Sequence, residues 1–263
     1  MTPSPAARIP ALLGLGLVAG LISGLFGVGG GLVVVPGLVA VLGLDHRRAV
    51  GTSLLAITPA VLASLASYAV TGSVDLVVGG LLALGAVIGA QLGAWLLHRV
   101  SRRAAQWVFI AFVAAMVVQL FISVPNREAV IELGPGQVAG LVVLGLVAGT
   151  LSSILGIGGG GVVVPVLMFA FGLGDLAAKG AALVMMVPTL ASGLWANLRR
   201  HNVDVRTGLV VGTAALATGP VGAWIAHAIP AQAGSWLFGA FLLFVGASMV
   251  REALRPARTE AVG

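Results

Sequence analysis

The stretch Ser23-Gly24-Leu25-Phe26-Gly27-Val28-Gly29-Gly30-Gly31, followed by Val33-Val34-Val35-Pro36, decides the fold because it occurs twice in the chain. The second copy lies 129 positions later and reads Ser152-Ser153-Ile154-Leu155-Gly156-Ile157-Gly158-Gly159-Gly160-Gly161, followed by Val162-Val163-Val164-Pro165. The same shift aligns residues 17–100 with residues 146–229 without a gap. The sequence is therefore an internal duplication with one glycine-rich motif in each half.

The sequence around both motifs is strongly apolar. Hydrophobic residues make up 59% and charged residues 8% of the chain, whereas a soluble domain has roughly 25% charged residues. Eight apolar runs approach or reach the roughly 20 residues that a helix needs to cross a bilayer; they lie near 9–28, 49–71, 76–97, 105–124, 137–157, 181–198, 207–229 and 234–250. The runs lack the alternation of a membrane barrel, so the sequence predicts an all-α polytopic membrane protein.

Basic residues in the loops indicate how the two halves are oriented. The loop at 72–75 has no arginine while its counterpart at 199–206 has three, and the loop at 98–103 has three while its counterpart at 227–233 has none. Because Lys and Arg concentrate on the cytoplasmic side of a membrane, this contrast predicts that the halves have inverted topology.

The predicted organisation has two repeats and a linker. Residues 1–124 form the first repeat, residues 125–136 an external linker, and residues 137–263 the second, inverted repeat with a short cytoplasmic tail. Placing 199–206 inside requires the chain after the linker to return to the face where it entered. Each repeat is therefore predicted as a broken or re-entrant helical hairpin at the glycine motif plus three transmembrane helices. Both termini are expected to be cytoplasmic, in the cell membrane.

The paired glycine motifs resemble those of the TauE/SafE family of sulfite exporters and related anion permeases, over nearly the whole chain. Gly51-Thr52-Ser53-Leu54 is also similar to an element of that family, although the second copy reads Gly180-Ala181-Ala182-Leu183. The resemblance implies a shared fold and the transport of a small anion, most often sulfite, another sulfur-containing anion or an organic acid. It favours export and does not identify the anion.

Helix breaks near the membrane midplane can point free N–H groups at an anion, and the two glycine motifs fit that role. Nearby hydroxyls, one amide and one lysine complete the predicted substrate-binding set: Ser23, Gly27, Gly29, Gly30, Gly31, Thr52, Ser53, Ser152, Ser153, Gly156, Gly158, Gly159, Gly160, Lys179 and Asn197. The alternatives are that the glycines only let helices pack closely, that Lys179 extends to water, and that the polar residues only bond to neighbouring helices.

Other function classes find little support in the sequence. The chain has no cysteine, its acidic residues fall at or near predicted loops, and Asp75 and Asp204 are expected to cap helices. We therefore expect no enzyme activity, no metal site, no cofactor and no nucleic-acid partner. The expected partners are a small anionic substrate and the lipid bilayer, while coupling to protons or another ion and oligomer formation are left open. An anion channel and a permease for another small organic acid are the alternative functions.

Overall fold

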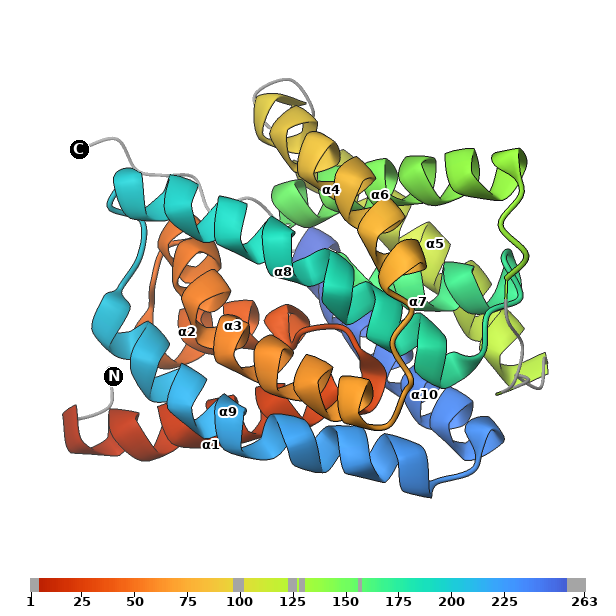
Figure 1. The fold of residues 1–263 in the computed structure, drawn as a ribbon. Coiled ribbons are helices and arrows are strands. Elements are labelled where there is room, and N and C mark those ends of the chain that lie inside the picture. Colours follow the sequence, from red (N-terminus) through yellow and green to blue (C-terminus); the bar gives the residue numbers. More distant parts are fainter. Residues whose placement is uncertain (1–4, 97–101, 123–126, 128–130, 156–157, 255–263) are drawn as a thin grey trace.

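The computed structural model of the chain describes residues 5–96, 102–122, 127, 131–155 and 158–254. In these ranges all regular structure is helical (Figure 1), which confirms the predicted fold class. The helices are α1 (Pro5–Phe26), α2 (Gly31–Leu42), α3 (His46–Val70), α4 (Leu76–Leu96), α5 (Arg102–Ile122), α6 (Pro135–Leu155), α7 (Gly160–Phe169), α8 (Asp175–Arg199), α9 (Val205–Ala228) and α10 (Ala231–Leu254). Within the described part, α1, α3, α4, α6, α8, α9 and α10 are long and apolar enough to cross a membrane.

Helices α4 and α9 begin after an aspartate, whereas α2 and α7 begin after a glycine. Asp75 accepts hydrogen bonds from the backbone N–H groups of Val77 and Val78 at 3.0 and 2.9 Å. Asp204 accepts one from Thr207 N at 3.1 Å, so both aspartates cap helices as expected. By contrast, α2 and α7 begin directly after glycines in the left-handed backbone region, a conformation that side chains with a Cβ atom disfavour.

Each half contains a helical hairpin that is interrupted at the glycine motif. A Cβ atom added to Gly30 would lie 2.6 Å from the carbonyl oxygen of Ala19, and Gly37 packs against Leu15, so α2 runs back along α1. In the second half, Gly159 lies beside Ala148 and Gly140 beside Phe171, so α7 runs back along α6. With 12 and 10 residues, α2 and α7 extend about 18 and 15 Å, well short of the roughly 30 Å of a bilayer core.

The long helices of one half pack against those of the other half. In Figure 1, α1 lies along α9 and α4 crosses beside α6, and these are the most extensive helix pairs. Gly20 packs against the carbonyl of Ala215, and Gly149 packs against the carbonyl of Ala86. These two contacts are related by the 129-residue shift with the halves exchanged, because Gly20 matches Gly149 and Ala86 matches Ala215.

The ends of α3 and α8 follow the same exchange. Gly51 packs against the carbonyl of Asn202, and Gly180 packs against that of Ser73, which are again positions related by the shift. Leu54 near the start of α3 contacts Gly193 near the end of α8, so these two helices run antiparallel.

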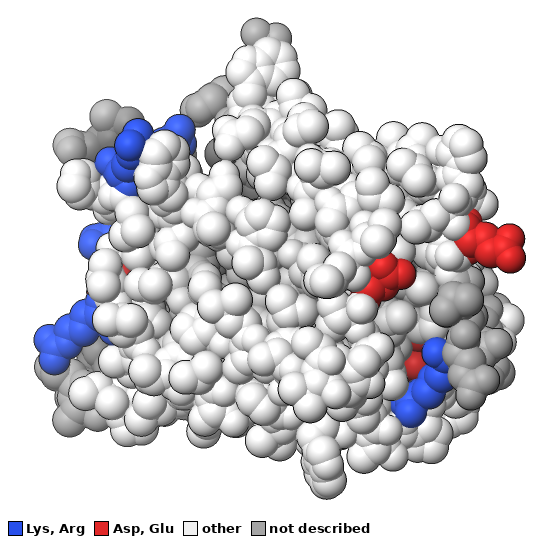
Figure 2. Space-filling view, viewed as in Figure 1, with Lys and Arg blue, Asp and Glu red and all other residues white. Residues whose placement is uncertain are grey.

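The described arginines are unevenly distributed between the two ends of the bundle. Exposed arginines gather at one end, on the left in Figure 2, and belong to the start of α3 and to the turn between α8 and α9: Arg47, Arg48, Arg199, Arg200 and Arg206. Asp75 and Glu132 precede α4 and α6, which begin toward the opposite end in Figure 1, and the arginine described in the segment before α6 is Arg127.

Candidate functional site

The two hairpin tips meet inside the bundle. A Cβ atom added to Gly160, the first residue of α7, would lie 2.6 Å from Gly27 O and 2.7 Å from Val28 Cα of the other tip. Val28 is fully buried. The two motifs, which are 129 residues apart in the sequence, therefore form one central structure.

Backbone geometry explains why the tips consist of glycine. Gly27, Gly29 and Gly30 have φ values of 69°, 76° and 74°, and Gly158 and Gly159 have values of 79° and 78°. Residues with a Cβ atom rarely adopt such values, which cost them roughly 1–2 kcal/mol. Positive φ at consecutive positions is more than helix packing requires, so close packing alone does not account for the motifs.

Each tip presents the N-terminus of a short helix. The N–H groups of Val33 and Val34 donate to Gly30 O at 3.0 and 3.1 Å, and those of Val162 and Val163 donate to Gly159 O at 3.1 and 3.2 Å. The preceding N–H groups, including that of Gly31, have no acceptor inside their own helix. They carry the positive end of the helix dipole, which favours a negatively charged ligand.

Apolar side chains of α3 and α8 fill the space beside the tips. The methyl group of Met186 contacts Gly29, and it lies 2.8 Å from the position of a Cβ atom on Gly158. Ile57, which the 129-residue shift relates to Met186, also borders Gly158. Both side chains are buried, so the tips are closed in this conformation.

The predicted serines lie on the arms of the hairpins. Ser23 is fully buried one turn before the first tip, and its hydroxyl has no hydrogen-bond partner among the described residues. Ser152 borders Gly159, and Ser153 borders Gly93 of α4. Both are half-buried. Gly156 lies outside the described residues.

Three predicted polar residues lie toward the arginine-rich end, away from the tips. Thr52 Oγ1 accepts a hydrogen bond from Asp204 N at 2.9 Å. Ser53 donates to Val50 O at 2.8 Å, and Asn197 Nδ2 donates to Gly193 O at 2.9 Å. The bond of Thr52 joins α3 to the start of α9, as the structural alternative predicts, whereas Ser53 and Asn197 bond to backbone within their own helices. None of these bonds involves a hairpin tip.

Lys179 lies next to the first tip but does not extend to water. A Cβ atom on Gly27 would be 2.9 Å from Lys179 Cα, and Lys179 is only 3% exposed. Its Nζ atom donates to Asp175 Oδ2 at 3.1 Å. Asp175, the first residue of α8, is 1% exposed, so this carboxylate is buried although it borders a loop.

The sequence analysis missed Asp175, Arg127 and Met186. The four-residue spacing of Asp175 and Lys179 is a recognisable signal for an ion pair on one helix. Arg127, whose Nε atom is 3.2 Å from Asp175 Oδ1, approaches from the segment between α5 and α6, and the sequence carries no sign of that approach. Met186 looks like any other apolar residue of a membrane helix.

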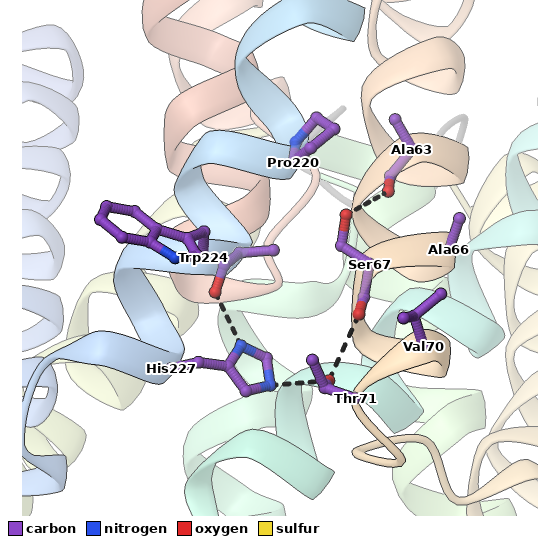
Figure 3. Close-up of a pocket in the computed structure, with 9 residues that line it drawn as sticks. Ala63, Ala66, Ser67, Val70, Thr71, Pro220, Trp224 and His227 are labelled. Carbon is purple, nitrogen blue, oxygen red and sulfur yellow. Dashed lines mark hydrogen bonds between the residues drawn. The ribbon is translucent and has the colours of Figure 1, made fainter.

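A separate groove of about 550 Å³ lies between α3 and α9 (Figure 3). Ala63, Val70, Pro220 and Trp224 give it mostly apolar walls, and the His227 imidazole is hydrogen-bonded to Thr71 Oγ1 at 2.9 Å and Ala223 O at 2.7 Å. Val70 and Trp224 are strongly exposed. The residues that line the groove include no lysine or arginine, and the groove is not part of the candidate site.

The fold and the paired tips define a multi-pass helical membrane protein with a central pair of interrupted hairpins. The chain belongs to the sulfite exporter TauE/SafE family, whose sequence profile matches residues 2–120 and 141–262. The family assignment made from the glycine motifs is thereby confirmed.

Curated relatives carry general names. The chain is 32% identical over 120 residues to "Probable membrane transporter protein YunE" of Bacillus subtilis, a match that covers 43% of this chain and 44% of the relative. It is 30% identical over 161 residues to a "Probable membrane transporter protein" of Haemophilus influenzae, covering 58% of this chain and 60% of the relative. A protein of the same printed name from Xylella fastidiosa is 28% identical over 198 residues, covering 73% and 74%. No solved structure matches the chain.

The chain thus spans less than two thirds of the length of the first two relatives, which it matches over 44% and 60%. Their names describe membrane transport and state no substrate.

Proposed function

We propose that this chain is a secondary transporter of a small oxyanion across the cytoplasmic membrane, with sulfite or an organosulfur anion as its substrate. The observation that carries the proposal is the meeting of two glycine tips, each at the N-terminus of a short helix. Two positive helix ends beside one buried contact between the tips suit a small anion better than a cation. The predicted substrate-binding glycines and Ser23 provide the first contacts.

The proposed mechanism is alternating access between inverted repeats, residues 1–124 and 137–263, joined by an external linker at 125–136. The exchanged contacts of α1 with α9 and α6 with α4, and the antiparallel course of α3 and α8, support the inversion. Rocking of one repeat against the other would open the tips to either side in turn. Because Met186 fills the space beside the tips, its flexible side chain has to move when the anion binds.

The charge distribution supports an orientation with the arginine-rich end in the cytoplasm. Five exposed arginines lie at that end, and such clusters mark the cytoplasmic side of membrane proteins. The segment at 131–134 and the turn after α3 are then external, and both chain termini are proposed to be cytoplasmic. Export as the net direction rests on family resemblance alone.

An anion channel and a permease for another small organic acid are the rival functions. A channel would pass the anion without saturating at low concentration and would not exchange labelled for unlabelled anion. An organic-acid permease would use the same helix N-termini but prefer a carboxylate such as acetate.

The test is flux of sulfite in liposomes that contain the purified protein, with protein-free liposomes as control. Sulfate, thiosulfate, a sulfonate and acetate serve as competitors, with and without a pH gradient. Saturable sulfite movement with counterflow supports the carrier, and its response to the pH gradient tests proton coupling. Flux of acetate but of no sulfur oxyanion would show that the substrate is an organic acid instead of a sulfur oxyanion. Linear flux without counterflow would show that the protein is a channel and not a carrier.

A further inference from the structure

A group of three charges lies at the end of the bundle opposite to the arginine-rich end: Asp175 and Lys179 are buried, and the Arg127 side chain is 29% exposed. Asp175 Oδ2 is 3.1 Å from Lys179 Nζ, and Asp175 Oδ1 is 3.2 Å from Arg127 Nε. Arg127 also donates to three carbonyls at the end of α9, those of Ala226, His227 and Ile229. The group therefore connects the start of α8, the end of α9 and the segment before α6.

The cations outnumber the carboxylate in this group. Two cations and one carboxylate give the three side chains a formal charge of +1, and burial of an uncompensated charge is costly. Lys179 has three N–H donors, of which one has an acceptor among the described residues. Arg127 Nε faces Asp175 outside hydrogen-bond geometry and has no other acceptor there. These donors therefore lack hydrogen-bond acceptors among the described residues, while the buried oxygens Asp175 Oδ1 and Gln232 Oε1 lack donors there.

The surroundings of Lys179 add further groups suited to an anion. Its Nζ atom lies 3.9 Å from the position of a Cβ atom on Gly234, in the first turn of α10. Gly234 N donates to Pro230 O at 3.0 Å, whereas the N–H groups that precede it in this turn lack helical acceptors. The next residue, Ser235, is 3% exposed and its hydroxyl has no hydrogen-bond partner among the described residues. Phe238, one turn further, stacks on Phe26 at the first hairpin tip with 5.2 Å between ring centroids. The charged group and the first hairpin tip are therefore both in contact with α10.

The first repeat has no such group at the related positions. The 129-residue shift places His46 at the position of Asp175 and Val50 at that of Lys179. Helix α3, the counterpart of α8 in the first repeat, packs into the bundle with Val50 at this position, so the fold does not require the charged group. The group therefore distinguishes α8 from its counterpart.

We propose that Lys179 and Arg127, with the first turn of α10, form an outer binding site for the transported oxyanion, in which Asp175 occupies the anion position until the substrate replaces it. The inference rests on the proposed function and adds to it a second site next to the first hairpin tip. The site holds one anionic group at a time: the Asp175 carboxylate in the closed conformation and the substrate oxyanion in the loaded one. Tyr68 and His227, whose rings are 5.0 Å apart, lie at the same end of α3 and α9, where Asp75 and Glu132 are further described titratable groups.

The experiment compares sulfite affinity in four single variants of the detergent-purified protein, measured by calorimetric titration. Lys179→Gln and Arg127→Gln each remove one charged donor, and we expect them to weaken sulfite binding about tenfold or more. Asp175→Asn removes the competing carboxylate with little change in shape, and we expect it to strengthen sulfite binding several-fold. Arg206→Gln removes an exposed arginine from the opposite end and should leave the affinity unchanged.

Unaltered affinity in Lys179→Gln and Arg127→Gln would overturn the inference, and so would an Asp175→Asn protein that binds sulfite as weakly as Lys179→Gln. If Asp175→Asn does not fold, the Arg127→Gln variant still tests the inference, because Arg127 is partly exposed. Liposome flux of the wild-type protein separates this inference from the proposed function. A wild type that neither binds nor moves any tested oxyanion overturns both, whereas flux and binding that do not depend on Lys179 overturn this inference alone.

Discussion

At the scale of the residue, the left-handed glycines of the tips set the geometry of the candidate site, and Gly159 is the best place to test it. A Cβ atom there would lie 3.3 Å from Met185 Cε, a tight contact that the flexible end of the methionine can relieve, but φ is 78°. Gly159→Ala therefore adds strain of roughly 1–2 kcal/mol, which the chain relieves by moving the start of α7. We expect a loss of sulfite affinity of about tenfold, the equivalent of ~1.4 kcal/mol, measured as the half-saturating concentration in liposome flux.

Gly80→Ala is the matched control, because Gly80 lies in α4 with no atom within 4 Å of the added Cβ and has ordinary helical geometry. Its flux should equal that of the wild type. Equal flux in Gly159→Ala as well would show that the tip geometry does not matter for transport.

The individual residues also show what the sequence could predict. Consecutive glycines pointed to a helix break because few other structures need them, and the break is present at Gly27–Gly30 and Gly158–Gly159. The ion pair of Asp175 and Lys179 could have been found from its spacing. The approach of Arg127 and the position of Met186 could not, because both depend on contacts between segments far apart in the chain.

At the scale of the element, close contact of α1 with α9 depends on small residues. Gly20 faces the carbonyl of Ala215 and has no space for a Cβ atom, while Gly14 on the same helix has nothing within 4 Å. Gly20→Ala should push the helices apart and lower stability by roughly 1–3 kcal/mol, seen as a lower midpoint of thermal unfolding in detergent. Gly14→Ala should keep the wild-type midpoint. Equal midpoints for the two variants would contradict the observed packing of α1 on α9.

Helix α9 offers a second test at this scale. Asp204 accepts hydrogen bonds from Thr207 N and from Thr207 Oγ1, and its own N–H donates to Thr52. Asp204→Ala should cost about 0.5–2 kcal/mol of stability, whereas Asp204→Asn retains the capping oxygen and should cost little. Thermal unfolding of both proteins measures the difference, and equal loss in both would show that the charge of Asp204, not its capping bond, is what stabilises α9.

The helices themselves were largely predictable because each apolar run has to satisfy its backbone within the bilayer. The runs near 105–124 and 207–229, for example, correspond to α5 (Arg102–Ile122) and α9 (Val205–Ala228). The partner of each helix was not predictable, because α1 packs on α9 and α4 on α6 through contacts between the two halves. Periodicity indicates that a helix forms but not which distant helix covers it.

At the scale of the whole molecule, the cluster of exposed arginines at one end predicts the orientation of the protein in the membrane. Because the chain has no cysteine, single introduced cysteines can test this orientation directly. Glu132 and Arg200 are both exposed. Glu132 precedes α6 and Arg200 follows α8, and these helix ends lie at opposite ends of the bundle in Figure 1. In intact cells a membrane-impermeant maleimide should label Glu132→Cys, but should label Arg200→Cys only after the membrane is permeabilised. Ala60→Cys, at a position that is 1% exposed, should stay unlabelled in both conditions and controls for unfolding. If Glu132→Cys and Arg200→Cys were labelled from the same face, the two ends of the bundle could not lie on opposite sides of the bilayer, and the inverted arrangement of the repeats would lose its basis.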